Sequence, residues 1–91
     1  MYAIILSSGY RKALKHIVRH KDFNAKKLEE VISALSRGEE LGLKHRNHEL
    51  KGKLVGLREC HIQNNMLLVY KVIKDNLILV LVDIGSHSDL F

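Results

Sequence analysis

Residues 66–84 read MLLVYKVIKDNLILVLVDI, and this stretch decides the fold class. Aliphatic and β-branched residues dominate it, and a turn signal, Asp75-Asn76, divides it. Asp and Asn tolerate the positive φ angles of tight turns, so the pattern predicts two strands, 66–73 and 77–84, joined by a hairpin. The run from Leu77 to Val82 is apolar throughout, which is typical of a strand covered on both faces. We therefore expect the last strand in the interior of a sheet.

The rest of the chain adds two strands and two helices. A strand at 56–62 precedes a second turn signal, Asn64-Asn65, and residues 2–7 form an apolar strand at the N-terminus. Between these strands, apolar residues recur at helix spacing in two stripes. The stripes consist of Tyr10, Ala13, Leu14, Ile17 and Val18, and of Leu28, Val31, Ile32 and Leu35. Ser7 or Ser8 and Asn24 are suited to cap the helix starts, and Gly38 ends the second helix.

These elements predict one α+β domain over residues 1–91, in the order β-α-α-β-β-β. A two-helix hairpin packs on a four-stranded, mainly antiparallel sheet. Residues 39–55 are rich in Gly, Lys and His and are too irregular to form an element. Connections of this length in compact domains are usually functional or disordered, and the basic end of this one favours function.

Net charge, the cysteine count and the absence of long apolar runs indicate which partners and which cell compartment to expect. The net charge of +5 favours nucleic acid or an acidic protein segment, although many small basic proteins bind neither. A basic face on the first helix is more often only solvated. Cys60 is the one cysteine, which excludes an intramolecular disulfide and fits a reducing cytoplasm. The sequence has no apolar run of membrane-spanning length and no signal peptide, so we expect a cytoplasmic protein without a membrane partner.

Three histidines in the polar parts of the second half, His48, His61 and His87, are candidate catalytic residues. Imidazole exchanges protons near neutral pH, as RNA cleavage by transesterification requires. A base removes the ribose 2′-OH proton, an acid protonates the leaving 5′-oxygen, and a cation stabilises the transition state. The nucleophile belongs to the substrate, so this chemistry needs neither metal nor cofactor. For any one of the histidines alone, a solvent-facing or capping role is the more common one.

Other sites are less favoured by the sequence. His16 and His20 have i, i+4 spacing and His45 and His48 form an H-x-x-H pair, but no third metal ligand accompanies either pair. A Cys60–His61 nucleophile is disfavoured because adjacent strand residues face opposite ways. The same alternation separates Arg58 from His61, so a bulge or a site wrapping the sheet edge is needed to join them.

Four motifs together identify the chain as similar to the YafQ-type toxins of the RelE/ParE superfamily. They are H-x-L-x-G at 48–52, R-x-x-H at 58–61, L-x-Y-K at 68–71 and G-S-H-S-x-L-F at 85–91. The resemblance covers nearly the whole chain. It implies an endoribonuclease that cleaves mRNA at the ribosome and a toxin–antitoxin hetero-oligomer with a DinJ- or RelB-like antitoxin. It implies acid–base and positioning roles for His48, His61 and His87, and substrate contacts by Arg58 and the terminal Phe91.

The chain departs from the YafQ pattern at three positions. Asn65 stands where the family has an aspartate, Met66 where it has a tryptophan, and Asp83 where it has an arginine for the phosphate. Asparagine can hydrogen-bond but cannot act as a base. We therefore expect Asn65 to bind substrate, and Arg58, Lys51 or Lys53 to carry the transition-state charge. The alternative is a non-enzymatic toxin of the same fold that inhibits DNA gyrase or another target by binding.

Overall fold

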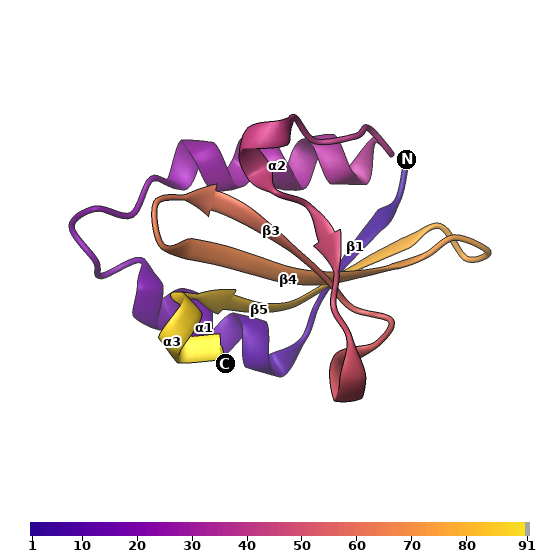
Figure 1. The fold of residues 1–91 in the computed structure, drawn as a ribbon. Coiled ribbons are helices and arrows are strands. Elements are labelled where there is room, and N and C mark those ends of the chain that lie inside the picture. The colour runs from indigo at the N-terminus through magenta and orange to yellow at the C-terminus, as the bar shows by residue number, and fades with distance from the viewer. Residues whose placement is uncertain (91) are drawn as a thin grey trace.

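A computed structural model describes residues 1–90 and places their strands in one sheet of order β1-β5-β4-β3-β2 (Figure 1). The strands are β1 (Ala3–Leu6), β2 (His48–Glu49), β3 (Arg58–Gln63), β4 (Met66–Ile73) and β5 (Ile78–Gly85). β1 runs parallel to β5, and every other pair is antiparallel. The expected meander is confirmed, and β5 lies inside the sheet between β1 and β4.

Two helices cover one face of this sheet. α1 (Ser8–Ile17) begins where the Ser7 side chain accepts a hydrogen bond from the Tyr10 backbone N–H, at 3.0 Å. α2 (Ala25–Ser36) begins where Asn24 Oδ1 accepts from the Lys27 N–H, at 3.1 Å. Such caps satisfy backbone donors that the first helical turn leaves free. The expected helix starts are therefore confirmed.

The main hydrophobic core lies between these helices and the sheet. Buried residues of α1 and α2 pack there against residues that alternate along the three central strands, except at the irregularity in β5 between Leu81 and Ile84. The strand members are Cys60, Ile62, Met66, Leu68, Tyr70, Leu79, Leu81 and Ile84. Because side chains alternate along a strand, the residues between them point to the opposite face. Leu67 is buried without belonging to this core, so the opposite face is covered at that position.

The connector at 39–55 contains short elements, contrary to our expectation. It forms two 3₁₀ turns, η1 (Leu43–His45) and η2 (Gly52–Leu54), with β2 between them, which makes the sheet five-stranded rather than four-stranded. A two-residue strand has no detectable periodicity of its own. It forms because the β3 backbone offers a free edge for pairing.

A last helical turn, α3 (His87–Leu90), follows β5 directly. Ser86 caps it, because Ser86 Oγ accepts from the Asp89 N–H and the Asp89 carboxylate accepts from the Ser86 N–H. This reciprocal arrangement is a capping box. Within residues 1–90, none of the helices is long and apolar enough to cross a membrane.

Candidate active site on the sheet face opposite the helices

Strand pairing places two rows of residues, polar and apolar, on the sheet face away from α1 and α2. Directly paired residues share a face, so the pairs His48–Glu59, Glu59–Val69 and Val69–Asp83 form one row. His61, Leu67 and Gly85 form the next row, two residues further along β3. We call His48, Glu59, His61 and Asp83 the histidine face.

His48 is oriented by contacts at both ring nitrogens. Its Nδ1 lies 2.7 Å from the backbone carbonyl of Arg46, and since a carbonyl only accepts, Nδ1 is the donor. Its Nε2 then lies 3.8 Å from the Glu59 carboxylate. Glu59 is only 2 % exposed, so this negative charge is held against the sheet beneath the ring.

His61 is the ring on which the charges of the site converge. Partial burial and the nearby Arg46 guanidinium lower the pKa of His61, and the Glu59 carboxylate opposes that shift. The rings of His48 and His87 also act on the pKa of His61, each lowering it. The three predicted histidines therefore form one electrostatic cluster, although they come from β2, β3 and α3.

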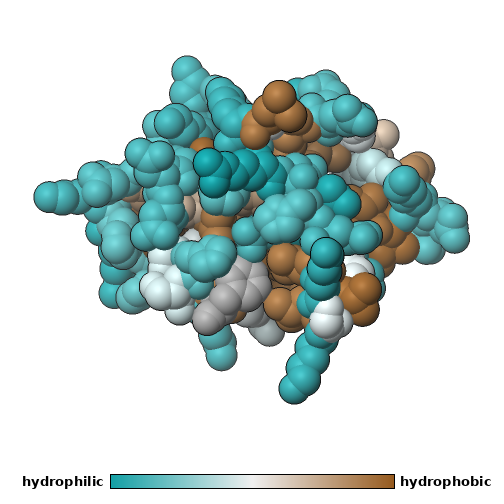
Figure 2. All heavy atoms as spheres, viewed as in Figure 1, coloured by the Kyte–Doolittle hydropathy of each residue, from teal (hydrophilic) through white to brown (hydrophobic). Residues whose placement is uncertain are grey.

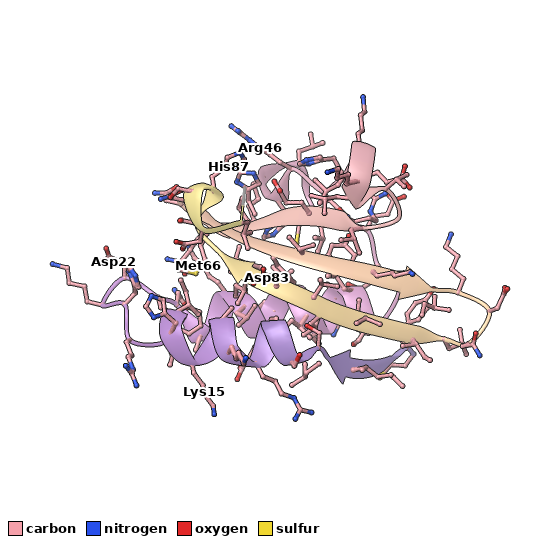
Figure 3. The ribbon with its side chains drawn as sticks, turned by 90° about the horizontal axis from the view of Figure 1, so that it is seen from below. Lys15, Asp22, Arg46, Met66, Asp83 and His87 are labelled. Carbon is pink, nitrogen blue, oxygen red and sulfur yellow. The ribbon has the colours of Figure 1, made fainter. Side chains whose placement is uncertain are left out.

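His87 reaches this cluster because α3 folds back over the end of β5. Gly85 is buried there, and a Cβ at this position would lie 3.1 Å from the Asp89 Cβ. A larger residue at Gly85 would push α3 outward. Figure 3 shows His87 next to Arg46 on the side of the sheet away from α1, which carries Lys15 on its far surface.

Two site residues, Glu59 and Arg46, were not among the candidates from sequence. Glu59 lies two residues before His61, so strand alternation alone places it on the same face. Arg46 gives no such signal. It adopts the left-handed conformation, at φ 46°, and is fixed by its neighbours: His45 Nδ1 donates to the His61 carbonyl at 2.7 Å, and His48 holds the Arg46 carbonyl.

Arg58 lies apart from the histidines. It pairs with Tyr70 on the helix-covered face, and the strand irregularity falls between His61 and Gln63, where it does not bring Arg58 round. Arg58 Nε donates to Asn47 Oδ1 at 3.3 Å, and the Tyr70 hydroxyl donates to the same oxygen at 2.6 Å. In this structure Arg58 therefore helps to anchor the connector.

The structure describes three of the other predicted substrate contacts, Lys51, Lys53 and Asn65. Lys51 precedes η2 and Lys53 lies within it, and both are exposed. Asn65 occupies the turn after β3 at φ 53° and lines a cavity together with His61. Phe91 lies outside the described residues.

Cys60 and the pair His16–His20 do not form a second site. Burial raises the pKa of the Cys60 thiol to about 12, and its side chain belongs to the main core. His16, on α1, and His20, which follows the end of that helix, contact each other edge to face. Among residues 1–90, no cluster of three or more His, Cys, Asp or Glu side chains is placed to hold a metal ion.

Residues 2–91 match the sequence profile of a family described as the bacterial toxin of a type II toxin–antitoxin system, YafQ. The chain belongs to this family. A search of curated protein sequences finds no match. Solved structures of YafQ-family toxins share the whole fold, which confirms the resemblance read from the four motifs.

Similar solved structures of YafQ-family toxins come from Helicobacter pylori and E. coli. A metal-bound toxin from Helicobacter pylori is 41% identical, with 100% of both chains covered and a TM-score of 0.91. YafQ from E. coli strain BL21(DE3) is 26% identical, covers 100% of this chain and 99% of its own, and has a TM-score of 0.86. A chain of the E. coli DinJ–YafQ complex is 27% identical with the same coverage and a TM-score of 0.83.

Proposed function

We propose that this YafQ-family toxin is an endoribonuclease that cleaves mRNA at the ribosome in the cytoplasm, by acid–base transesterification without a metal. The observation that carries the proposal is the convergence of three imidazoles, one buried carboxylate and one guanidinium on a single sheet face. These are the groups that proton transfer and phosphate stabilisation require.

His61 is best suited to be the base. The lowered pKa of His61 favours the neutral ring, which is the form that can accept the proton of the ribose 2′-OH. The 2′-oxygen then attacks the phosphorus, and the leaving 5′-oxygen takes a proton from a second imidazole of the cluster, His48 or His87. Glu59 would stabilise His48 whenever that ring carries the proton, because its carboxylate lies 3.8 Å from Nε2.

Arg46 is the guanidinium placed to stabilise the extra negative charge on the phosphate. Its charge acts directly on His61, whereas Arg58 is bonded to Asn47 on the other side of the sheet. Asp83 lies on the histidine face and repels a phosphate there. Lys51, Lys53, Asn65 and Phe91 remain proposed substrate contacts.

The proposal is tested with purified toxin on a defined mRNA, with and without ribosomes. We expect cleavage by the wild type, and no cleavage or growth arrest by His87→Ala. If the wild type leaves RNA intact in both conditions, and His87→Ala still arrests growth, the proposal is wrong. Inhibition of gyrase supercoiling without RNA cleavage would support the non-enzymatic alternative, which the repulsive Asp83 favours.

We also propose a DinJ- or RelB-like antitoxin as the partner of this chain, in a toxin–antitoxin hetero-oligomer. The E. coli structure of a DinJ–YafQ complex supports this proposal. An acidic antitoxin segment would suit a chain of net charge +5, and its affinity should fall as salt increases. Titration calorimetry with the candidate antitoxin at two salt concentrations tests the idea, and the absence of binding at both would contradict it.

A further inference from the structure

A cavity of about 840 Å³ opens beside His61, at the end of β3. Its walls come from α2, from the connector and from the turn between β3 and β4. His61 and Arg46 line this cavity, and both also belong to the proposed active site. The cavity therefore adjoins the histidine face. We call it the β3-edge cavity.

The floor and the rim of the β3-edge cavity differ in chemistry. Val31 and Ile62 on the floor are buried, and Ala34 and Leu41 beside them are half-buried. The rim carries three acidic and three basic side chains. They are Asp22, Glu30, Glu40, Lys27, Lys44 and Arg46. These six side chains have no net charge, although the chain as a whole carries +5.

This balance decides which part of a nucleic acid the cavity fits. Grooves that follow the phosphate backbone of single strands are uniformly basic. An unstacked base needs apolar contact for its flat face and hydrogen-bond donors and acceptors for its edge. The β3-edge cavity offers an apolar floor, the Glu30 carboxylate, the Lys27 ammonium and the Asn64 amide. It therefore fits a base better than a phosphate.

The cavity is held open by contacts that span its walls. Gln63 Nε2 donates to the Asp22 carbonyl at 2.6 Å, and Gln63 Oε1 accepts from the Asn24 N–H at 2.8 Å. These bonds tie the end of β3 to the segment before α2. On the other side, His45 ties the connector to the His61 carbonyl. A pre-formed pocket loses little entropy when it binds a ligand.

We propose that the β3-edge cavity is a subsite that binds the base of the RNA nucleotide next to the cleaved phosphate and selects it. This inference rests on the proposed ribonuclease function. Figure 2 shows one face of the molecule as mainly hydrophilic with separate hydrophobic patches. Glu30, Lys27 and Asn64 are the selecting residues.

The test compares cleavage patterns of matched variants on a random pool of short RNAs, by sequencing the ends produced. Glu30→Ala and Asn64→Ala each remove one rim group, and both positions are exposed, so folding should survive. The controls are Glu29→Ala, next to Glu30 on α2, and Asn76→Ala, in the other hairpin turn. Neither control residue lines this cavity. Thermal unfolding checks that all four variants fold.

We expect wild-type cleavage to favour one base at one position beside the cut. Glu30→Ala and Asn64→Ala should each weaken that preference by about fivefold to tenfold, the effect of one lost hydrogen bond. The two controls should keep the wild-type preference. An unchanged base preference in both rim variants overturns the inference. An equal loss of cleavage for all four bases also overturns it, because that result would indicate phosphate binding. Weaker antitoxin binding with unchanged cleavage would assign the cavity to a protein partner and also overturn it. Failure of the wild type to cleave RNA contradicts the proposed function instead.

Discussion

Asn47 joins the connector to the core, and we expect its loss to disturb both stability and the site. Its Oδ1 accepts hydrogen bonds from the Tyr70 hydroxyl at 2.6 Å and from Arg58 Nε at 3.3 Å. Tyr70 is 1 % exposed, so in Asn47→Ala water cannot readily replace the lost acceptor. A buried hydroxyl left without a partner costs about 1–3 kcal/mol. For a domain of this size, about 2 kcal/mol lowers Tm by about 10 °C.

The geometry also predicts how this loss can be reversed. Removing both partners of a buried hydrogen bond costs much less than removing one. We therefore expect the free energy of unfolding of Asn47→Ala/Tyr70→Phe to exceed the value predicted from the two single variants by about 1 kcal/mol. Urea denaturation of the four proteins measures this coupling. Additive effects, within about 0.3 kcal/mol, would refute the anchoring role.

Asn47 lies between Arg46 and His48 in the sequence, so we expect the loss of its side chain to move these two site residues and to affect catalysis. The Asn47 side chain accepts its hydrogen bonds on the helix-covered side of the sheet, and the two neighbouring residues face the site. Asn47→Ala should therefore lower kcat at temperatures where the protein is still folded. Normal kcat in a folded Asn47→Ala variant would show that the connector keeps its position without this bond.

Three further predictions address the site and the core. Arg46 lowers the pKa of His61 and Glu59 raises it. Arg46→Ala should therefore move the acid limb of the pH–rate profile to higher pH, and Glu59→Gln should move it to lower pH. Shifts of both variants in the same direction would contradict His61 as the base. Asp83→Arg should raise kcat/KM by about threefold to tenfold, from about 1 kcal/mol of better phosphate attraction, whereas Asp75→Arg in the distant turn should not. Cys60 is buried, with its pKa raised to about 12, so a thiol reagent at pH 8 should label it only as fast as the protein unfolds, and rapid labelling of the native chain would argue against this packing.

Much of the fold could be predicted because it rests on long, regular patterns. Strands β4 and β5 follow from an apolar run with one turn signal, although Leu77, expected to begin the last strand, lies in the turn at φ 53° and β5 runs from Ile78 to Gly85. Both helices follow from their stripes and caps. β2 could not be found in this way, since two residues carry no periodicity. It exists through pairing with β3, a contact between distant parts of the chain.

The site was predicted in part, for similar reasons. Period-two alternation already separated Arg58 from His61, and the structure keeps them on opposite faces. The same rule would have grouped Glu59 with His61, but an acid in a strand usually faces solvent. Arg46 depends on a left-handed backbone and on two histidine–carbonyl bonds, none of which a linear pattern reveals.

The chemistry of the RNA ends tests the central claim most directly. Transesterification by imidazoles leaves a 2′,3′-cyclic phosphate on the upstream fragment and needs no divalent metal. Wild-type toxin with excess chelator should therefore produce such ends, and His61→Ala and His87→Ala should produce none. Fragments with 3′-hydroxyl ends, or cleavage that the chelator abolishes, would contradict a site built from His48, His61 and His87.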